Sequence, residues 1–285
     1  MQVQLGCFAY VFSEFPLEVA LDAIARAGYR YVGLGLAPRE APVPNDQSGA
    51  AEGAAMRRRL EGVGLKGIFS FAPSPVGEGG IERFRRRIEF CQAAGVPFIV
   101  ATGAWGYKKW PDVPFTPAEM EQQNAPFYAA FRELAPYAQE AGVSILLKPH
   151  TGSTATSKEC LQTLRAIDHP AVRICYDAGN VRFYEGIAPE DDVLPLLPYV
   201  KGLCLKDHQG PRANPNFPVP GEGGVDHRLL FARLKEGGFS GPMVLERVDG
   251  TMKKAEMSLE LTSERVARAR RNVLAALEAV GASVE

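Results

Sequence analysis

Several short apolar segments of this chain end on residues that can carry out acid–base or ligand chemistry. The residues at or near these ends are Lys148 with His150, Asp177, Lys206 with His208, and Glu246. Apolar runs that stop at such residues are typical of buried parallel strands whose carboxyl ends face one site. An ionised carboxylate is costly to bury without a cation. We therefore expect these side chains to lie together.

The residue types indicate chemistry at a carbonyl group. As an ammonium ion, Lys148 can polarise a carbonyl, and with a lowered pKa it can act as a base or a Schiff-base nucleophile. Glu246 is the candidate for proton abstraction, and Lys206 is a second catalytic candidate. The carboxylates of Asp177 and Glu246 can instead be partnered by a divalent metal.

Positioning these residues requires a scaffold that gathers strand ends, and the chain predicts one. Apolar, strand-like segments alternate with helical segments eight times along the 285 residues. The predicted strands cover 3–10, 31–36, 65–71, 98–103, 143–150, 172–177, 200–207 and 243–248. This alternation predicts a parallel sheet, and eight units predict an α/β fold: a single (β/α)8 TIM barrel domain over 1–285. A doubly wound open sheet is less favoured, because no glycine-rich phosphate fingerprint follows the first strand.

The predicted helices between the strands carry apolar stripes and stop signals. Ile81, Phe84, Ile88 and Cys91 follow helical spacing. The helix expected over 118–141 contains two prolines, so it is either one kinked helix or two shorter ones. Other helices are expected over 16–28, 50–61, 157–167, 189–197 and 227–236, with a last one near the C-terminus.

The loops after the strands supply candidates for substrate binding. An aromatic loop follows 98–103, and the loop after 200–207 is long and rich in proline and glycine, which suggests a lid. Aromatic rings can wall a sugar-sized pocket, and an arginine can meet an anionic group. The candidates are Phe8, Trp105, Tyr107, Asn180 and Arg212.

Composition narrows the classes of function. The net charge of −1 and the pI of about 6.5 do not provide the basic surface that nucleic-acid binding needs. The arginine runs 57–59 and 85–87 are interpreted as solvated helix faces. The five scattered cysteines indicate free thiols in a reducing compartment. With no signal-peptide pattern and no membrane-length apolar run, a cytoplasmic protein is expected.

The motifs at the strand ends resemble those of a known family. KPH, CYDAGN, CLKD, PGEGGVD and LERV, in this order, are similar to those of the xylose isomerase-like TIM barrels, and the resemblance covers essentially the whole chain. That family includes sugar phosphate isomerases and epimerases, inosose dehydratases and DNA-repair endonucleases. The resemblance implies a sugar or polyol substrate and a divalent metal held at the ends of the last four strands.

Residue by residue, the resemblance is incomplete. Asp177 and Glu246 match the family's aspartate and last glutamate. Lys148 stands where the family has its first glutamate, Cys204 where it has a histidine, and Asn180 where it has a nearby histidine. Either a manganese, magnesium or zinc ion is displaced onto other ligands, or Lys148 replaces its charge, or catalysis is lost. The ligands for a displaced ion would be His150, Asp177, His208 and Glu246.

The expected function is that of a sugar or sugar-phosphate isomerase or epimerase. Glu246 would remove a proton next to a carbonyl, and His150 or Lys206 would return one. An inosose dehydratase-like lyase and a non-catalytic sugar-binding barrel are the alternatives. A DNA-repair endonuclease is disfavoured, because only four histidines are present. The aromatic loop can equally contact a partner subunit, which leaves a homo-oligomer open.

Overall fold

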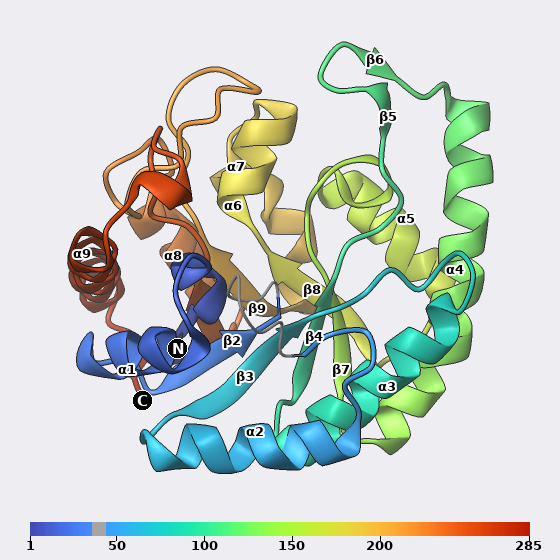
Figure 1. Ribbon diagram of the computed structural model, residues 1–285. Coiled ribbons are helices and arrows are strands. Elements are labelled where there is room, and N and C mark those ends of the chain that lie inside the picture. Colours follow the sequence, from blue (N-terminus) through green and yellow to red (C-terminus); the bar gives the residue numbers. More distant parts are fainter. Residues whose placement is uncertain (36–43) are drawn as a thin grey trace.

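The computed structural model describes residues 1–35 and 44–285, and its main sheet closes on itself (Figure 1). The barrel strands are β1 (Gln2–Phe8), β2 (Tyr31–Leu34), β3 (Lys66–Phe71), β4 (Phe98–Ala101), β7 (Ser144–Leu147), β8 (Val172–Tyr176), β9 (Val200–Leu205) and β10 (Gly241–Leu245). Each pairs in parallel with the next, and β10 pairs with β1. The predicted (β/α)8 barrel is therefore confirmed, and the open-sheet alternative is wrong.

Helices surround the barrel and connect its strands (Figure 1). They are α1 (Leu17–Arg26), α2 (Ala50–Gly62), α3 (Gly80–Ala94), α4 (Pro117–Glu140), α5 (Ser157–Ile167), α6 (Ala178–Asn180), α7 (Pro189–Asp192), α8 (His227–Glu236) and α9 (Leu259–Ala279). Short 3-10 or π segments are η1 (Ala9–Phe12), η2 (Gly152–Thr154), η3 (Val181–Glu185), η4 (Leu194–Tyr199) and η5 (Lys254–Glu256). None of the described helices is long and apolar enough to cross a membrane.

The remaining strands lie outside the barrel wall. β5 (Tyr107–Lys109) and β6 (Val113–Pro114) form a small antiparallel hairpin after β4, which projects at the top of Figure 1. β11 (Ser283–Val284) pairs with the start of β1. Most of the predicted strands extend past the observed ones into the following loops, and the predicted strand 31–36 ends outside the described residues.

Helix α4 resolves the question left by its two prolines. It is continuous through Pro126 and Pro136, although each proline removes one backbone donor. Its start is well defined, because Thr116 and Glu119 cap each other's backbone N–H groups, and Pro117 occupies the first turn. The two-helix alternative is therefore wrong.

Apolar side chains pack in two layers, one inside the barrel and one between barrel and helices. The interior layer consists of Phe8, Tyr31, Ile68, Phe69, Val100, Leu146, Cys175, Cys204 and Val244. The outer layer is larger and takes the alternate residues of the same strands, such as Leu203 and Leu205 of β9. This alternation is the period of two that a strand imposes on its side chains.

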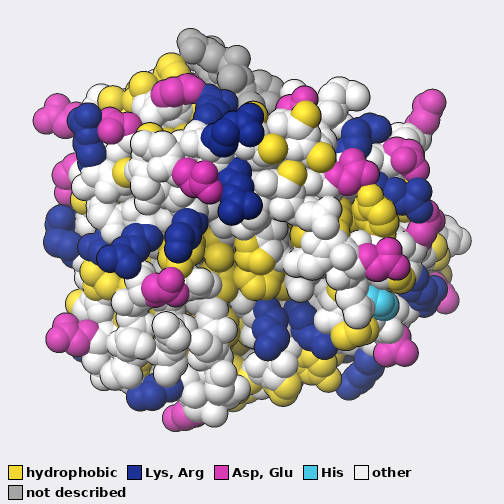
Figure 2. All heavy atoms as spheres, turned by 90° about the horizontal axis from the view of Figure 1, so that it is seen from below, with side chains coloured by type: hydrophobic (Ala, Val, Ile, Leu, Met, Phe, Trp, Pro, Cys, Tyr) yellow, Lys and Arg dark blue, Asp and Glu magenta, His cyan; other side chains and the backbone are white. Residues whose placement is uncertain are grey.

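The arginine runs are only partly solvated. Arg57 pairs with Glu61 at 3.0 Å, and Arg85 pairs with Glu82 and Glu133, as expected for exposed helix faces. Figure 2 shows basic and acidic side chains interspersed on one face of the molecule. Arg87 differs, because it is buried and donates hydrogen bonds to the carbonyl oxygen of Phe71 and to the carbonyls of residues 44 and 45. The prediction of a wholly solvated run is wrong at this position.

Candidate active site

The ionisable residues at the strand ends continue the interior rows of the barrel. Each lies two positions after a residue of the interior layer, so its side chain points to the same side of the sheet. The pairs are Leu146 and Lys148, Cys175 and Asp177, Cys204 and Lys206, and Val244 and Glu246. The strand period alone therefore places four charged side chains over the apolar interior, at the carboxyl end of the barrel.

These four side chains form one buried ionic cluster. The Nζ atom of Lys148 lies 3.0 and 2.8 Å from the two carboxylate oxygens of Glu246 and 3.4 Å from Asp177 Oδ2. The Nζ atom of Lys206 lies 3.1 Å from Glu246 Oε1 and 3.1 Å from Asp177 Oδ2. Two ammonium groups thus face two carboxylates, and their formal charges sum to zero.

The segment after β8 supports this cluster through its backbone and one amide. Asp177 caps the short helix α6, with its Oδ1 accepting the Asn180 N–H at 2.9 Å. The Asn180 side chain accepts from Lys206 Nζ at 2.8 Å and donates to the Pro149 carbonyl at 2.8 Å. Gly179 is required here, because a Cβ atom at this position would lie 2.7 Å from Lys206 Cγ.

Ion pairing outweighs burial in setting the charge states. Burial alone would favour neutral forms, but Glu246 and Asp177 raise the pKa of Lys148 well above its ordinary value. Burial opposes the charged form of Glu246 too, yet Lys148 and Lys206 hold its pKa below the ordinary range. Lys148 is therefore an ammonium ion and not a neutral amine, which argues against its use as a Schiff-base nucleophile in the resting protein.

The cluster is a poor fit for the divalent ion that the resemblance implies. Asp177, Cys204 and Glu246 offer ligand atoms within 4.8 Å of one another. Both carboxylates, however, already contact two ammonium groups. A dication and an ammonium group about 4 Å apart repel by on the order of 8 kcal/mol at an effective dielectric constant of about 20. This repulsion disfavours a divalent ion between the two carboxylates.

His150 and His208 do not complete this ligand group among the described residues. His150 Nε2 lies 2.9 Å from the hydroxyl of Tyr184. His208 Nε2 lies 2.8 Å from the carbonyl of Asn214, so this nitrogen carries the hydrogen. The ring of His208 packs against those of Phe183 and Phe217. Their roles as metal ligands therefore stay predictions, and in this geometry both side chains serve other partners.

The partial burial of His150 predicts a pH dependence of stability. Burial, followed by Lys148 and Lys206, lowers the pKa of His150 from 6.5 to about 3. Between these values the unfolded chain binds more protons than the folded one, so stability falls as the pH drops through this window. We expect His150→Gln to reduce this acid loss by up to about 1.4 kcal/mol per pH unit. Urea unfolding between pH 7 and 4 measures the difference.

The same measurement contains the outcome that would contradict this account. If His150→Gln keeps the wild-type slope of stability against pH, the cost of protonating His150 is not what reduces stability in acid.

Aromatic side chains gather around His150 at the mouth of the barrel. The ring of Trp105 lies 5.4 Å from that of His150, and Tyr184 lies 4.2 Å from it. Trp110 packs on Tyr184, and Tyr107 packs on Trp110. We call these five residues the mouth cluster. Sequence reasoning missed Tyr184, although it lies four residues after Asn180 and the segment 178–185 is helical, which places both on one side.

Arg212 joins the two long loops that meet at the mouth cluster. Its guanidinium donates to the Tyr184 carbonyl at 2.7 Å and to the Tyr107 hydroxyl at 2.7 Å. It also donates to the Pro111 carbonyl and stacks over the ring of Trp110 at 4.9 Å. Most of its donors are therefore committed to the protein, which leaves little capacity to bind an anionic substrate group.

We expect replacement of Arg212 to loosen the loops at the mouth of the barrel. Arg212→Lys keeps the charge but loses the planar fork, and each lost hydrogen bond is worth about 1 kcal/mol. We expect amide hydrogen exchange in the β5–β6 hairpin to rise by about tenfold, with the barrel strands unchanged. Arg228→Lys, an exposed site on α8, should leave the hairpin unchanged. Equal exchange in both variants would show that Arg212 does not hold the loops together.

Phe8 belongs to the interior layer below the ionic cluster and is fully buried. Its ring stacks on that of Phe71 at 4.4 Å, and Phe71 in turn lies 5.1 Å from Lys148 Nζ. The predicted substrate contact of Phe8 stays a prediction, while Phe71 places an aromatic ring next to Lys148. Phe71 was missed because its segment ends without an ionisable residue.

Asp207 shapes the long loop after β9. Its Oδ1 accepts the N–H groups of His208 and Val225, and its Oδ2 accepts those of Gly221 and Gly223, all at 2.8 to 3.0 Å. A Cβ atom on Gly223 would lie 2.4 Å from Asp207 Oδ1, so this close approach requires glycine. Asp207 therefore organises the glycine-rich loop.

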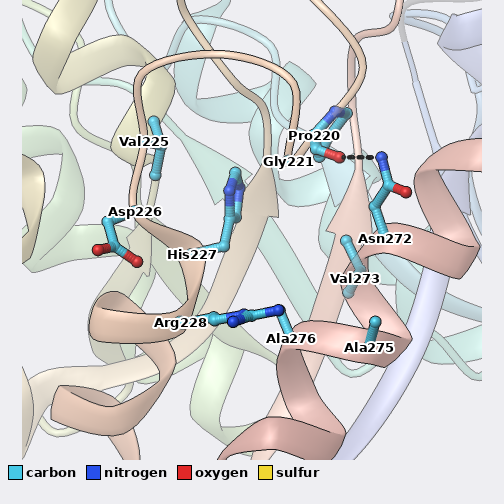
Figure 3. A pocket seen from close by; sticks show the side chains of 10 residues that line it. All are labelled: Pro220, Gly221, Val225, Asp226, His227, Arg228, Asn272, Val273, Ala275 and Ala276. Carbon is cyan, nitrogen blue, oxygen red and sulfur yellow. Dashed lines mark hydrogen bonds between the residues drawn. The ribbon is translucent and has the colours of Figure 1, made fainter.

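A cavity of about 370 Å³ lies between this loop and α9 (Figure 3). Across it, Asn272 donates to the Pro220 carbonyl at 3.0 Å, and the His227 ring stands between the loop and the helices. None of the residues that line the cavity belongs to the ionic cluster. We therefore place the candidate site at the ionic cluster and interpret the cavity as a gap behind the loop.

Comparison with known proteins adds a family and a fold. A family model described as xylose isomerase-like TIM barrel matches residues 21–276. An inosose dehydratase of Klebsiella pneumoniae (strain 342) is 25% identical over 190 residues, which cover 59% of this chain and 64% of the relative. One from Yersinia enterocolitica is 26% identical over 133 residues, 41% of this chain and 45% of the relative. The matched part of the chain thus spans less than two thirds of the length of these relatives.

Solved structures of low sequence identity share the fold. A xylose isomerase domain protein from Planctomyces limnophilus superposes with a TM-score of 0.75 at 16% identity, covering 97% of this chain and 98% of that one. A D-allulose 3-epimerase from Methylomonas sp., in complex with D-allulose, gives 0.73 at 19% identity, with 96% of each chain covered. A Mycobacterium smegmatis barrel protein in complex with magnesium gives 0.71 at 16%, covering 96% and 97%.

Proposed function

This chain belongs to the xylose isomerase-like TIM barrel family, and from that premise we propose that it is an isomerase or epimerase of a small sugar or polyol. The observation that carries the proposal is the pairing of Glu246 with two lysines at the carboxyl end of the barrel. A carboxylate that can accept a proton lies beside cations that can stabilise an oxyanion. Removal of a proton next to a carbonyl needs this combination.

The proposed first step moves one proton and redistributes the ion pairs. The carbonyl oxygen of the substrate accepts hydrogen bonds from the ammonium groups that otherwise pair with Glu246. Glu246 then removes the proton from the neighbouring carbon; the C–H electron pair forms a carbon–carbon double bond, and the carbonyl π electrons move to oxygen. The two ammonium groups then move from Glu246 to the enolate oxygen. Because Glu246 loses these ion pairs, its carboxylate becomes more basic at the step in which it accepts the proton.

The second step returns a proton, and the charge states favour Lys206 over His150. The ammonium group of Lys206 carries N–H donors and contacts both Glu246 and Asp177. His150 is uncharged above a pKa of about 3, because burial and the two lysines disfavour its protonated form. Proton return to the opposite face of the same carbon gives an epimer, and return to the neighbouring carbon gives an isomer.

The alternative reaction begins with the same proton removal. In an inosose dehydratase-like lyase, the enolate expels a hydroxide from the next carbon, and a protonated group supplies the proton that makes it water. The similarity to inosose dehydratases favours keeping this alternative. The committed donors of Arg212 favour an unphosphorylated substrate in either case.

One experiment separates these reactions. The protein is incubated in D2O with a panel of ketoses and inososes, and the products are followed by NMR. An isomerase or epimerase is expected to place deuterium on the carbon next to the carbonyl and to yield a new sugar. Loss of water identifies the lyase. Saturable binding without deuterium exchange on any panel member would contradict the proposal and support a non-catalytic sugar-binding barrel.

A further inference from the structure

We propose that the ammonium group of Lys148 occupies the place and takes the role of the divalent ion, so that the site works without a metal. The inference deepens the proposed function and rests on it for the role of the ammonium group. Lys148 stands where the family resemblance implies a carboxylate ligand. Its Nζ lies 2.8 Å from Glu246 and 3.4 Å from Asp177, the two carboxylates that match the family's ligands.

The local contacts show how the cation is held. Lys148 Nζ contacts both oxygens of Glu246, at 3.0 and 2.8 Å, which are the acceptors a metal would need. The ring of Phe71 lies 5.1 Å away on another side, and that residue's backbone is fixed by the buried Arg87. The Lys148 side chain is only 6% exposed, so water has little access to its ammonium group.

A second position at which the resemblance implies a metal ligand also carries a different residue. Cys204 stands where the resemblance implies a histidine ligand, and its sulfur lies 3.6 Å from that of Cys175 in the apolar interior. The thiol is buried at 2% exposure among apolar side chains, whereas metal binding needs the charged thiolate. The site has therefore lost a carboxylate and an imidazole and gained a fixed positive charge.

The consequence for chemistry is a change of electrophile. A bound metal would stabilise an enolate as a Lewis acid. Here, two ammonium groups about 3 Å from the same carboxylates can donate hydrogen bonds to the substrate oxygen. Because the cluster is neutral before substrate arrives, it suits an uncharged ketone. The ligand class is thus a neutral keto-sugar or keto-polyol, bound directly by lysine.

Metal titration of four proteins tests the inference. They are the wild type, Cys204→His, Lys148→Gln/Cys204→His and Lys148→Glu/Cys204→His, each titrated calorimetrically with manganese, magnesium and zinc. Folding of each is checked by thermal melting. We expect no saturable binding at the cluster in the wild type or in Cys204→His. The Glu-containing double variant should bind about one manganese ion, at least about a hundredfold more tightly than either the wild type or Cys204→His. The Gln variant should lie between.

Two results would overturn the inference. One is a wild-type protein that binds one equivalent of manganese as tightly as the Glu-containing double variant. The other is a folded Glu-containing variant that binds no better than Cys204→His, because the lysine charge would then not be what excludes the ion. If Cys204→His disturbs the interior layer, Lys148→Glu alone against the wild type provides the comparison. Absence of turnover on every sugar would count against the proposed function and not against this inference.

Discussion

Glu246→Gln is expected to lower turnover by a factor of about 10² to 10⁴, the usual contribution of a positioned general base. The amide keeps the shape of the side chain but cannot accept the proton. It also leaves two buried ammonium groups with one carboxylate, and breaking such a buried pairing costs about 3 to 5 kcal/mol of stability. Deuterium exchange into the substrate and thermal melting measure the two effects separately.

The control for this variant is Glu222→Gln. Glu222 is exposed and pairs with Arg268 at 2.9 Å, so its loss should change stability by no more than about 0.5 kcal/mol and leave exchange unaltered. Full deuterium exchange in a folded Glu246→Gln protein would remove Glu246 from the role of base. The proton would then have to be taken by another group of the site.

Asp207→Asn is expected to cost about 3 kcal/mol, and its effect should begin in the loop. Each carboxylate oxygen of Asp207 accepts two backbone N–H groups, so an amide nitrogen must face two donors whichever way it turns. Unsatisfied buried donors cost about 1 to 3 kcal/mol each. Gly221 and Val225, which donate two of these bonds, also line the cavity beside the loop (Figure 3). Amide exchange at residues 221–225 and the melting temperature report the loss.

Asp226→Asn is the matched control, because it makes the same chemical change on the same loop. Asp226 caps α8 by accepting the Leu229 N–H at 3.0 Å, and asparagine caps a helix about as well. Its stability should stay within about 0.5 kcal/mol of the wild type. Equal losses in both variants would mean that Asp207 has no special part in ordering the loop.

The sequence was sufficient to predict the barrel, because strand and helix periods differ sharply and alternate eight times. The strand ends were less predictable: the run 143–150 reads as one apolar strand, but β7 stops at Leu147. Lys148 still donates its backbone N–H to the Ala101 carbonyl at 2.8 Å, but the residues after it leave the strand. Where pairing ends is a property of the sheet and not of the segment. The sequence does not decide whether α4 continues through its two prolines for a similar reason, since tertiary packing determines this.

The ionic cluster was predictable in part. The sequence identifies the four residues that follow the interior rows of the strands, which are Lys148, Asp177, Lys206 and Glu246. What one-dimensional spacing could not give is which cation pairs with which carboxylate. It also could not give the commitment of Arg212 and His150 to other partners, since these contacts join segments far apart in the chain. Tyr184 and Phe71 were missed because aromatic residues carry no signal that separates a site from a core.

Inside the barrel, a level of charged residues lies on a level of apolar residues, and this has an evolutionary consequence. The apolar residues inside the barrel occupy one level, and the charged residues occupy the next level along the same strands. Exchanging an ionisable residue at the upper level alters charge balance but removes little of the packing below it. Substitutions at a few strand ends that keep the charges balanced can therefore change the chemistry of such a barrel while the apolar packing below them is inherited.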